Sequence, residues 1–160
     1  MKAFLGRFLR TLDSKGRLSL PSKYGKSPGK AYVVTRGLDR CLFVFVKDEW
    51  NRFLDELGSL RLESSRARFY VRQMTSNAED VTVDSHGRIV IPPAHRELAG
   101  LKGEVLVIGA LNRIELWDPE TFRKYEEGFG LTFEEVAESL WEKPSGPAGE
   151  DDESPKRERR

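Results

Sequence analysis

Residues that bind metals or form disulfides are scarce in this chain of 160 residues. Cys41 is the only cysteine, which excludes a disulfide framework and a thiolate metal site and predicts a reducing, cytoplasmic location. The two histidines, His86 and His95, have too few other ligands around them for a metal centre, so we expect both on the surface or in turns.

Long apolar runs are also missing. Arg7 interrupts the N-terminal segment before a secretory stretch could form, and no later run is long enough to cross a membrane. We therefore expect no export and no membrane partner. The sequence has no glycine-rich phosphate loop and no nucleophile elbow, so we expect no cofactor and no small-molecule substrate. Hydrophobic residues make up 38% of the chain, which is enough for a packed core.

Net charge is small but unevenly distributed. The chain carries +1 overall, whereas residues 1–30 hold eight Lys or Arg against one acidic residue. Residues 119–153 hold three Lys or Arg against eleven Asp or Glu. A basic segment of this kind is typical of a polyanion partner, although a solvated charged face is the simpler interpretation of a charge run taken alone.

One five-residue motif occurs twice, as Asp13-Ser14-Lys15-Gly16-Arg17 and as Asp84-Ser85-His86-Gly87-Arg88. Each copy is followed by an alternating apolar run that ends in proline, and further matches continue downstream at an offset of 71 to 73 residues. The chain is therefore a duplication. Two copies predict a pseudo-symmetric globular pair and not a solenoid, which needs three or more repeats to cover its core.

The pattern of apolar residues predicts an α+β fold in which each copy is a pair of β-hairpins. Strands are expected at residues 4–12, 18–20, 31–36 and 41–46, and in the second copy at residues 80–83, 89–91, 105–108 and 114–117. Helices are expected from Asp48, as the N-cap, to Leu60, at residues 64–74 and 94–99, after Asp118-Pro119, and at residues 132–141 behind a capping box of Thr132 and Glu135. The composition from residue 143 onward predicts a disordered tail.

The repeated motif has the chemistry of a rigid turn that presents an arginine. In each copy the aspartate can accept hydrogen bonds from backbone N–H groups, and Gly16 or Gly87 can adopt a positive φ. Arg17 and Arg88 then leave the turn with a planar guanidinium that suits phosphate oxygens or a guanine edge. The alternative is an internal Asp–Arg pair that only pins the turn. The basic residues around the first copy, Arg7 and Lys15 among them, favour a contact surface.

These motifs together resemble the MraZ family of bacterial transcriptional regulators. The resemblance covers about residues 1–142 and rests on these segments: Phe4-x-Gly6, Thr11-Leu12-Asp13-Ser14-Lys15-Gly16-Arg17, Trp50, Asp84-x-x-Gly87-Arg88, Ala99-Gly100-Leu101, Ile108-Gly109 and Glu115-Leu116-Trp117. It implies two SpoVT/AbrB-like swapped-hairpin repeats that form one double-repeat domain. We place these repeats at residues 7–54 and 80–125, a C-terminal helix at 130–142 and the tail at 143–160.

The resemblance also implies a function without enzymatic activity. It implies a ring-shaped homo-oligomer, associated with the nucleoid, that binds short direct repeats of double-stranded DNA upstream of the division and cell-wall gene cluster containing its own gene. Repression of that cluster is the expected result. The DNA-binding arginines of the family carry over to Arg17 and Arg88, and Lys15 matches the basic residue of the first motif. Arg7 and His86 are further candidate contacts, although His86 is mostly neutral at pH 7.

Two other functions fit parts of the sequence. The paired Asp-Ser segments resemble the loops of aspartic proteases, in which two carboxylates share a proton. However, an arginine follows each Asp-Ser segment closely and would keep its carboxylate ionised. The chain is also short for a bilobal protease. A ring-forming scaffold or adaptor that works through protein contacts, using the acidic C-terminal region, is the remaining alternative.

Overall fold

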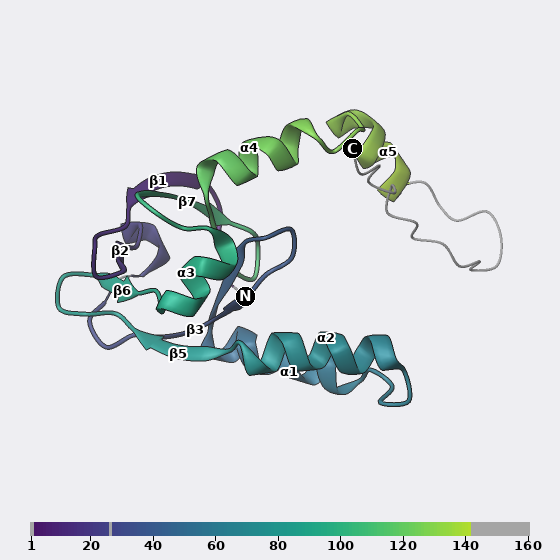
Figure 1. Ribbon diagram of the computed structural model, residues 1–160, viewed down its shortest axis with the longest axis horizontal. Coiled ribbons are helices and arrows are strands. Elements are labelled where there is room, and N and C mark those ends of the chain that lie inside the picture. Colours follow the sequence, from purple (N-terminus) through teal and green to yellow (C-terminus); the bar gives the residue numbers. More distant parts are fainter. Residues whose placement is uncertain (1, 26, 142–160) are drawn as a thin grey trace. The chain divides into compact units, whose positions relative to one another are not determined.

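The computed structural model of the protein describes residues 2–25 and 27–141 (Figure 1). The predicted tail at 143–160 lies outside the described residues. The chain divides after Glu126 into two units, and the described part of the second unit contains one helix, α5 (Phe133–Trp141).

The elements of each copy follow the same order. The first copy contains β1 (Arg7–Thr11), β2 (Arg17–Ser19), the short 3-10 helix η1 (Ser22–Tyr24), β3 (Ala31–Arg36), β4 (Leu42–Val46) and α1 (Lys47–Gly58). The second copy contains β5 (Glu79–Thr82), β6 (Arg88–Val90), α3 (Pro93–Ala99), β7 (Glu104–Gly109), β8 (Ile114–Trp117) and α4 (Pro119–Glu127). Between the copies lies α2 (Ser65–Ser76). The predicted mixture of helices and strands is confirmed.

The two copies exchange their first strands. The large sheet has the order β1-β7-β8-β4-β3-β5, and all its pairings are antiparallel. Figure 1 shows β1 beside β7 of the other copy and β5 beside β3. The prediction that each copy is a pair of hairpins is therefore wrong for the first hairpin. Its second strand, β2, pairs with β6 in a separate ribbon. The prediction failed because alternating apolar residues show which face of a strand is buried but not which strand is its partner.

Two residue pairs lie on the pseudo-twofold axis that relates the copies. In the ribbon, Leu18 pairs with Ile89, and these residues follow Arg17 and Arg88 in the two motifs. In the large sheet, Phe43 of β4 pairs with Glu115 of β8. The symmetric register shows that neither copy can complete its sheet without the other.

The central strands of the large sheet are covered on both faces. One face packs against the β2–β6 ribbon, η1 and α3 through a core that includes Leu18, Ile89 and Ile91, all of which are fully buried. The other face packs against α1, α2 and α4 through a second core. The second core contains Val33, Cys41, Phe43, Phe45, Trp50, Leu57, Met74 and Trp117. Burial raises the pKa of the Cys41 thiol far above its usual value, so this cysteine is an unreactive part of the core.

The predicted N-cap residues are found at the starts of their helices, with one exception. Asp118 accepts a hydrogen bond from Thr121 N–H at 3.0 Å, and Thr132 and Glu135 form the reciprocal capping box before α5. The prediction that Asp48 caps α1 is wrong. The helix begins at Lys47, immediately after β4, and Val46 is the N-cap without a side-chain hydrogen bond.

His95 is buried, so the expectation of a surface or turn position is wrong for this histidine. Its Nε2 lies 2.5 Å from the carbonyl oxygen of Asn77. In the first copy Tyr24 has the equivalent role, because its hydroxyl donates to the carbonyl oxygen of Leu5 at 2.8 Å. Both side chains tie the segment after the ribbon to the segment before the first strand. His86, in contrast, is exposed in its turn, as predicted.

Candidate nucleic-acid interface

The first motif forms a turn organised by Asp13. One carboxylate oxygen accepts hydrogen bonds from the backbone N–H groups of Lys15 at 3.0 Å and Arg17 at 2.9 Å. The other oxygen accepts from Arg17 Nε at 2.5 Å. Gly16 has a φ of +78°, which favours glycine because a Cβ is strained there. A single carboxylate thus fixes both the backbone of the turn and the direction of its arginine.

The second motif repeats this geometry. Asp84 accepts from the backbone N–H groups of His86 at 2.8 Å and Arg88 at 2.9 Å, and from Arg88 Nε at 2.9 Å. Gly87 has a φ of +76°. The same residues at the same spacing therefore produce the same turn twice, as the sequence predicts from the hydrogen-bonding capacity of aspartate.

The hydrogen bonds lower the pKa of both turn carboxyls. For Asp13 the largest cause is the backbone N–H of Arg17, and for Asp84 it is the backbone N–H of Arg88. Partial desolvation opposes these effects without reversing them. Each carboxylate is bonded to its own arginine and stays ionised at neutral pH, so the pair lacks the shared proton that an aspartic protease needs.

A lowered pKa in the folded state predicts acid-sensitive turns. The stabilisation is complete above the unfolded value of 3.8 and is lost as the pH falls through the folded-state pKa. We expect Asp13→Asn to lower the melting temperature by a constant amount between about pH 5 and 8, and by less below pH 3.8. Thermal unfolding followed by circular dichroism measures this, with Asp55→Asn on exposed α1 as the matched control. A difference that persists unchanged at about pH 2.5 would contradict the role of the Asp13 charge.

The β2–β6 ribbon places the two arginines together on one face. Arg17 is paired with Val90, and Arg88 is paired with Ser19. Because side chains alternate along a strand, these four residues share one face, while Leu18 and Ile89 point into the core. Arg17 and Arg88 are diagonal neighbours, a relation that corresponds to roughly 7–8 Å in a ribbon.

Backbone hydrogen bonds join the two turns directly. Ile91 N–H donates to the carbonyl oxygen of Gly16 at 2.8 Å, and Leu20 N–H donates to that of Gly87 at 3.2 Å. The pseudo-twofold symmetry between the copies makes these two bonds equivalent. The two turns therefore form one rigid unit, and the spacing between the two arginines is fixed.

The outer parts of both guanidinium groups remain available. The side chains of Arg17 and Arg88 are 33% and 27% exposed. Within residues 2–25 and 27–141, their terminal nitrogens make no hydrogen bond. Each arginine is thus aligned by its Nε, while the nitrogens that can form bidentate contacts face outward.

The other predicted contacts lie in different places. Lys15 and His86 are exposed at equivalent positions of the two turns, and His86 Nδ1 lies 3.2 Å from Ser85 Oγ. Arg7 is at the opposite end of β1, about 20 Å of extended chain from Asp13. There its guanidinium lies over the Phe122 ring, and it forms a 3.6 Å salt bridge with Glu126 of α4. Its position favours a role in holding α4 against the edge of the sheet.

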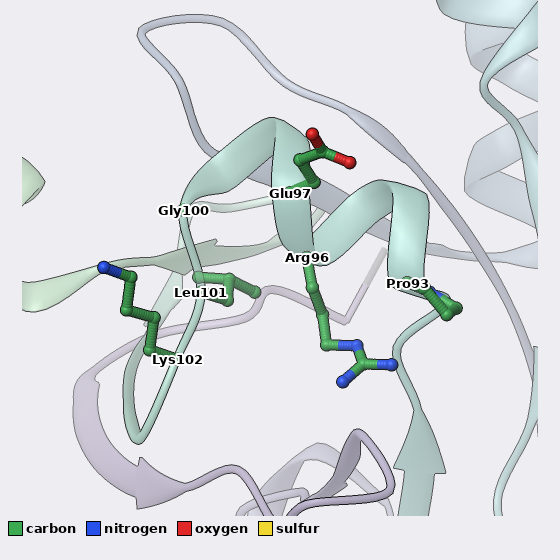
Figure 2. Close-up of a pocket in the computed structure, with 6 residues that line it drawn as sticks. All are labelled: Pro93, Arg96, Glu97, Gly100, Leu101 and Lys102. Carbon is green, nitrogen blue, oxygen red and sulfur yellow. The ribbon is translucent and has the colours of Figure 1, made fainter.

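Sequence reasoning missed two cations beside the first turn. Arg96 extends from α3 towards the turn, whereas Glu97 leaves the same helix in the opposite direction (Figure 2). Arg96 and Lys102 line a surface pocket together with Pro93, Glu97, Gly100 and Leu101 (Figure 2). An alignment of the two copies could have revealed these cations, because the first copy has no basic residue at either corresponding position.

The described residues contain no cluster of three or more His, Cys, Asp or Glu side chains that could hold a metal ion. Among the same residues, no helix combines the length and the apolar character needed to cross a membrane.

Comparison with known proteins identifies the family. The family model described as "MraZ protein, putative antitoxin-like" matches twice, at residues 3–73 and 74–142, in agreement with the duplication. The chain belongs to the MraZ family.

The chain matches three relatives over nearly their whole length. The chain is 42% identical over 137 residues to a protein of Heliobacterium modesticaldum, covering 86% of this chain and 96% of the relative. It is 39% identical over 136 residues to one of Caldanaerobacter subterraneus, with 85% and 95% covered. It is 40% identical over 139 residues to one of Alkaliphilus metalliredigens, with 87% and 97% covered. Each of the three is named "Transcriptional regulator MraZ".

Proposed function

We propose that this protein is a DNA-binding transcriptional regulator that acts without enzymatic activity. The observation that carries the proposal is the pair of arginines on the outer face of the β2–β6 ribbon, each aligned by its own aspartate. The major groove of DNA is about 12 Å wide and admits a two-stranded ribbon of this kind. The names of the relatives support the same function.

In this proposal the arginines and their neighbours have different tasks. Arg17 and Arg88 reach guanine edges or phosphates with their free terminal nitrogens, because a guanidinium fits guanine O6 and N7 in a bidentate manner. Lys15 and the turn backbone contact phosphates and set the register. His86 takes the place of Lys15 in the second turn and contributes less charge at neutral pH.

We further propose that the protein forms a ring-shaped homo-oligomer on short direct repeats upstream of its own division and cell-wall gene cluster. In the cytoplasm, at the nucleoid, it represses that cluster. Linking several protomers raises the affinity for adjacent repeats by on the order of a hundredfold or more, provided that the repeat spacing fits the ring. A single repeat should therefore bind poorly.

A mobility-shift assay with the upstream region of its own gene tests the proposal. We expect tight binding to the intact repeats, weak binding to a duplex with scrambled repeats, and loss of affinity between about 50 and 200 mM salt. Light scattering of the same sample gives the oligomeric state. Equal binding to both duplexes would exclude sequence-specific binding. Absence of binding to both would exclude the DNA-binding function.

A protein scaffold is the second candidate, and α5 is the observation that favours it. Phe133, Leu140 and Trp141 on this helix are 82%, 74% and 86% exposed, and exposed apolar side chains on one helix are typical of protein contacts. This function predicts that a partner protein is retained only by chains that contain residues 130–160, with no DNA present.

A further inference from the structure

The side chain of Arg96 packs against the first turn from the opposite copy. A Cβ placed on Gly16 would lie 3.0 Å from Arg96 Cζ and 3.1 Å from its Nε, so the guanidinium lies close against the turn. The Nε is buried, and within the described residues it has no hydrogen-bond partner. Arg96 also makes no salt bridge in that part of the chain. Its charge is therefore not neutralised where it meets the turn.

The loop that carries Lys102 adjoins the same turn. The carbonyl oxygen of Gly103 accepts a hydrogen bond from Leu12 N–H at 2.7 Å, directly before Asp13. This bond places the loop that carries Lys102 beside the beginning of the turn. Lys102 is exposed and lines the same pocket as Arg96 (Figure 2). The second copy thus places Arg96 against the first turn and an exposed lysine on the loop beside it, in addition to Lys15 and Arg17.

In the first copy, glycines occupy the two positions that correspond to Arg96 and Lys102. Pro21 corresponds to Pro92 and Tyr24 to His95, so the position of Arg96 is taken by Gly25. The hydrogen bond from Val83 N–H to Lys30 corresponds to the one from Leu12 N–H to Gly103, so the position of Lys102 is taken by Gly29.

Lys30 does not replace the missing cations. Its Nζ donates a hydrogen bond to the carbonyl oxygen of Tyr24 at 3.2 Å and lies over the Tyr32 ring. This ammonium group is therefore used within the first copy. The two turns are therefore alike in backbone geometry and differ in charge at these two described positions.

We propose that Arg96 and Lys102 bind DNA phosphates beside the first turn and so strengthen its electrostatic contact with DNA. This inference rests on the proposed DNA-binding function. A guanidinium held against the turn without a carboxylate partner and an exposed ammonium on the adjoining loop form a cationic surface that extends the contact of Arg17 along the DNA backbone.

The test is the salt dependence of binding to the intact repeats. The slope of log K against log salt is negative, and each lost phosphate contact makes it less steep by about 0.9. For the variant Arg96→Gln/Lys102→Gln we expect a slope that is less steep by about 1.8 per bound protomer, so that affinity changes about tenfold less between 50 and 200 mM salt. The control is Arg61→Gln, which removes an 87% exposed arginine in the α1–α2 connection and should leave the slope unchanged.

A further variant separates phosphate binding from a merely structural contact. Arg96→Lys keeps the charge and should keep the slope of the wild type, even if it loses some thermal stability. If the wild type binds its repeats and the double glutamine variant has the same affinity and slope, the inference is overturned while the DNA-binding function stands. If the wild type binds no DNA, the proposed function fails and the inference fails with it.

Discussion

Replacing Arg17 with alanine is expected to weaken binding to the direct repeats by on the order of a hundredfold or more. Loss of one bidentate contact costs about 1–3 kcal/mol, and the loss recurs in every protomer that engages a repeat. The structure gives no substitute for the free terminal nitrogens of Arg17, because Arg88 is fixed at its own end of the ribbon. Mobility shifts with the upstream region measure the change.

Two controls make this result specific. Arg61→Ala removes the same charge from an exposed site in the α1–α2 connection and should bind as the wild type does. Light scattering should give Arg17→Ala the mass of the wild type, because Arg17 bonds only within its own turn among the described residues. Undiminished binding by an oligomer of wild-type mass would exclude Arg17 from the interface.

The variants Arg17→Ala and Arg88→Ala together assign a role to each turn arginine. A base contact relaxes sequence preference when it is removed, whereas a phosphate contact weakens binding to all sequences alike. Comparing both variants on intact and scrambled repeats therefore assigns each arginine to one of these roles.

The substitution Gly109→Ala is expected to destabilise the protein by about 3 kcal/mol, which lowers the melting temperature by roughly 6–12 °C. A Cβ at Gly109 would lie 2.3 Å from Leu5 N and 2.5 Å from the carbonyl carbon of Phe4. Both contacts are to the main chain, which cannot rotate away. The substitution would push the N-terminal segment off β7 and disturb the strand that leads into the first turn. Thermal unfolding measures the loss.

Gly103→Ala is the matched control for this prediction. It precedes β7, has no atom within 4 Å of the position of a Cβ, and does not have a positive φ. We expect its stability to remain within about 1 kcal/mol of the wild type. Equal melting temperatures for the two alanine variants would show that the N-terminal segment does not pack on Gly109.

Local chemistry made the turns predictable. Aspartate accepts hydrogen bonds from N–H groups a few residues later, and glycine takes a positive φ at low cost, so five consecutive residues define the geometry. The bonds of Asp13 and Asp84 match this expectation in both copies. Most helix ends were predictable for the same reason, since a cap depends on neighbours in sequence. At Asp48 the prediction failed because β4 runs directly into α1.

Strand pairing was not predictable from the pattern of apolar residues. Alternation shows which face of a strand is buried but does not name its partner. The pairing of β1 with β7, and of β2 with β6, depends on the surface that the copies bury together. The resemblance to the MraZ family supplied the exchange of hairpins, which the residues of one copy did not.

By itself the sequence determined the duplication, the two turns and the arginines they present, because these follow from residues close together in the chain. Only the tertiary structure decided what lies around each turn. Arg96 is 80 positions from Gly16 in the sequence and in contact with it in space. Packing one copy across the other put Arg96 against the first turn and the loop of Lys102 beside it, whereas glycines occupy the corresponding positions of the first copy.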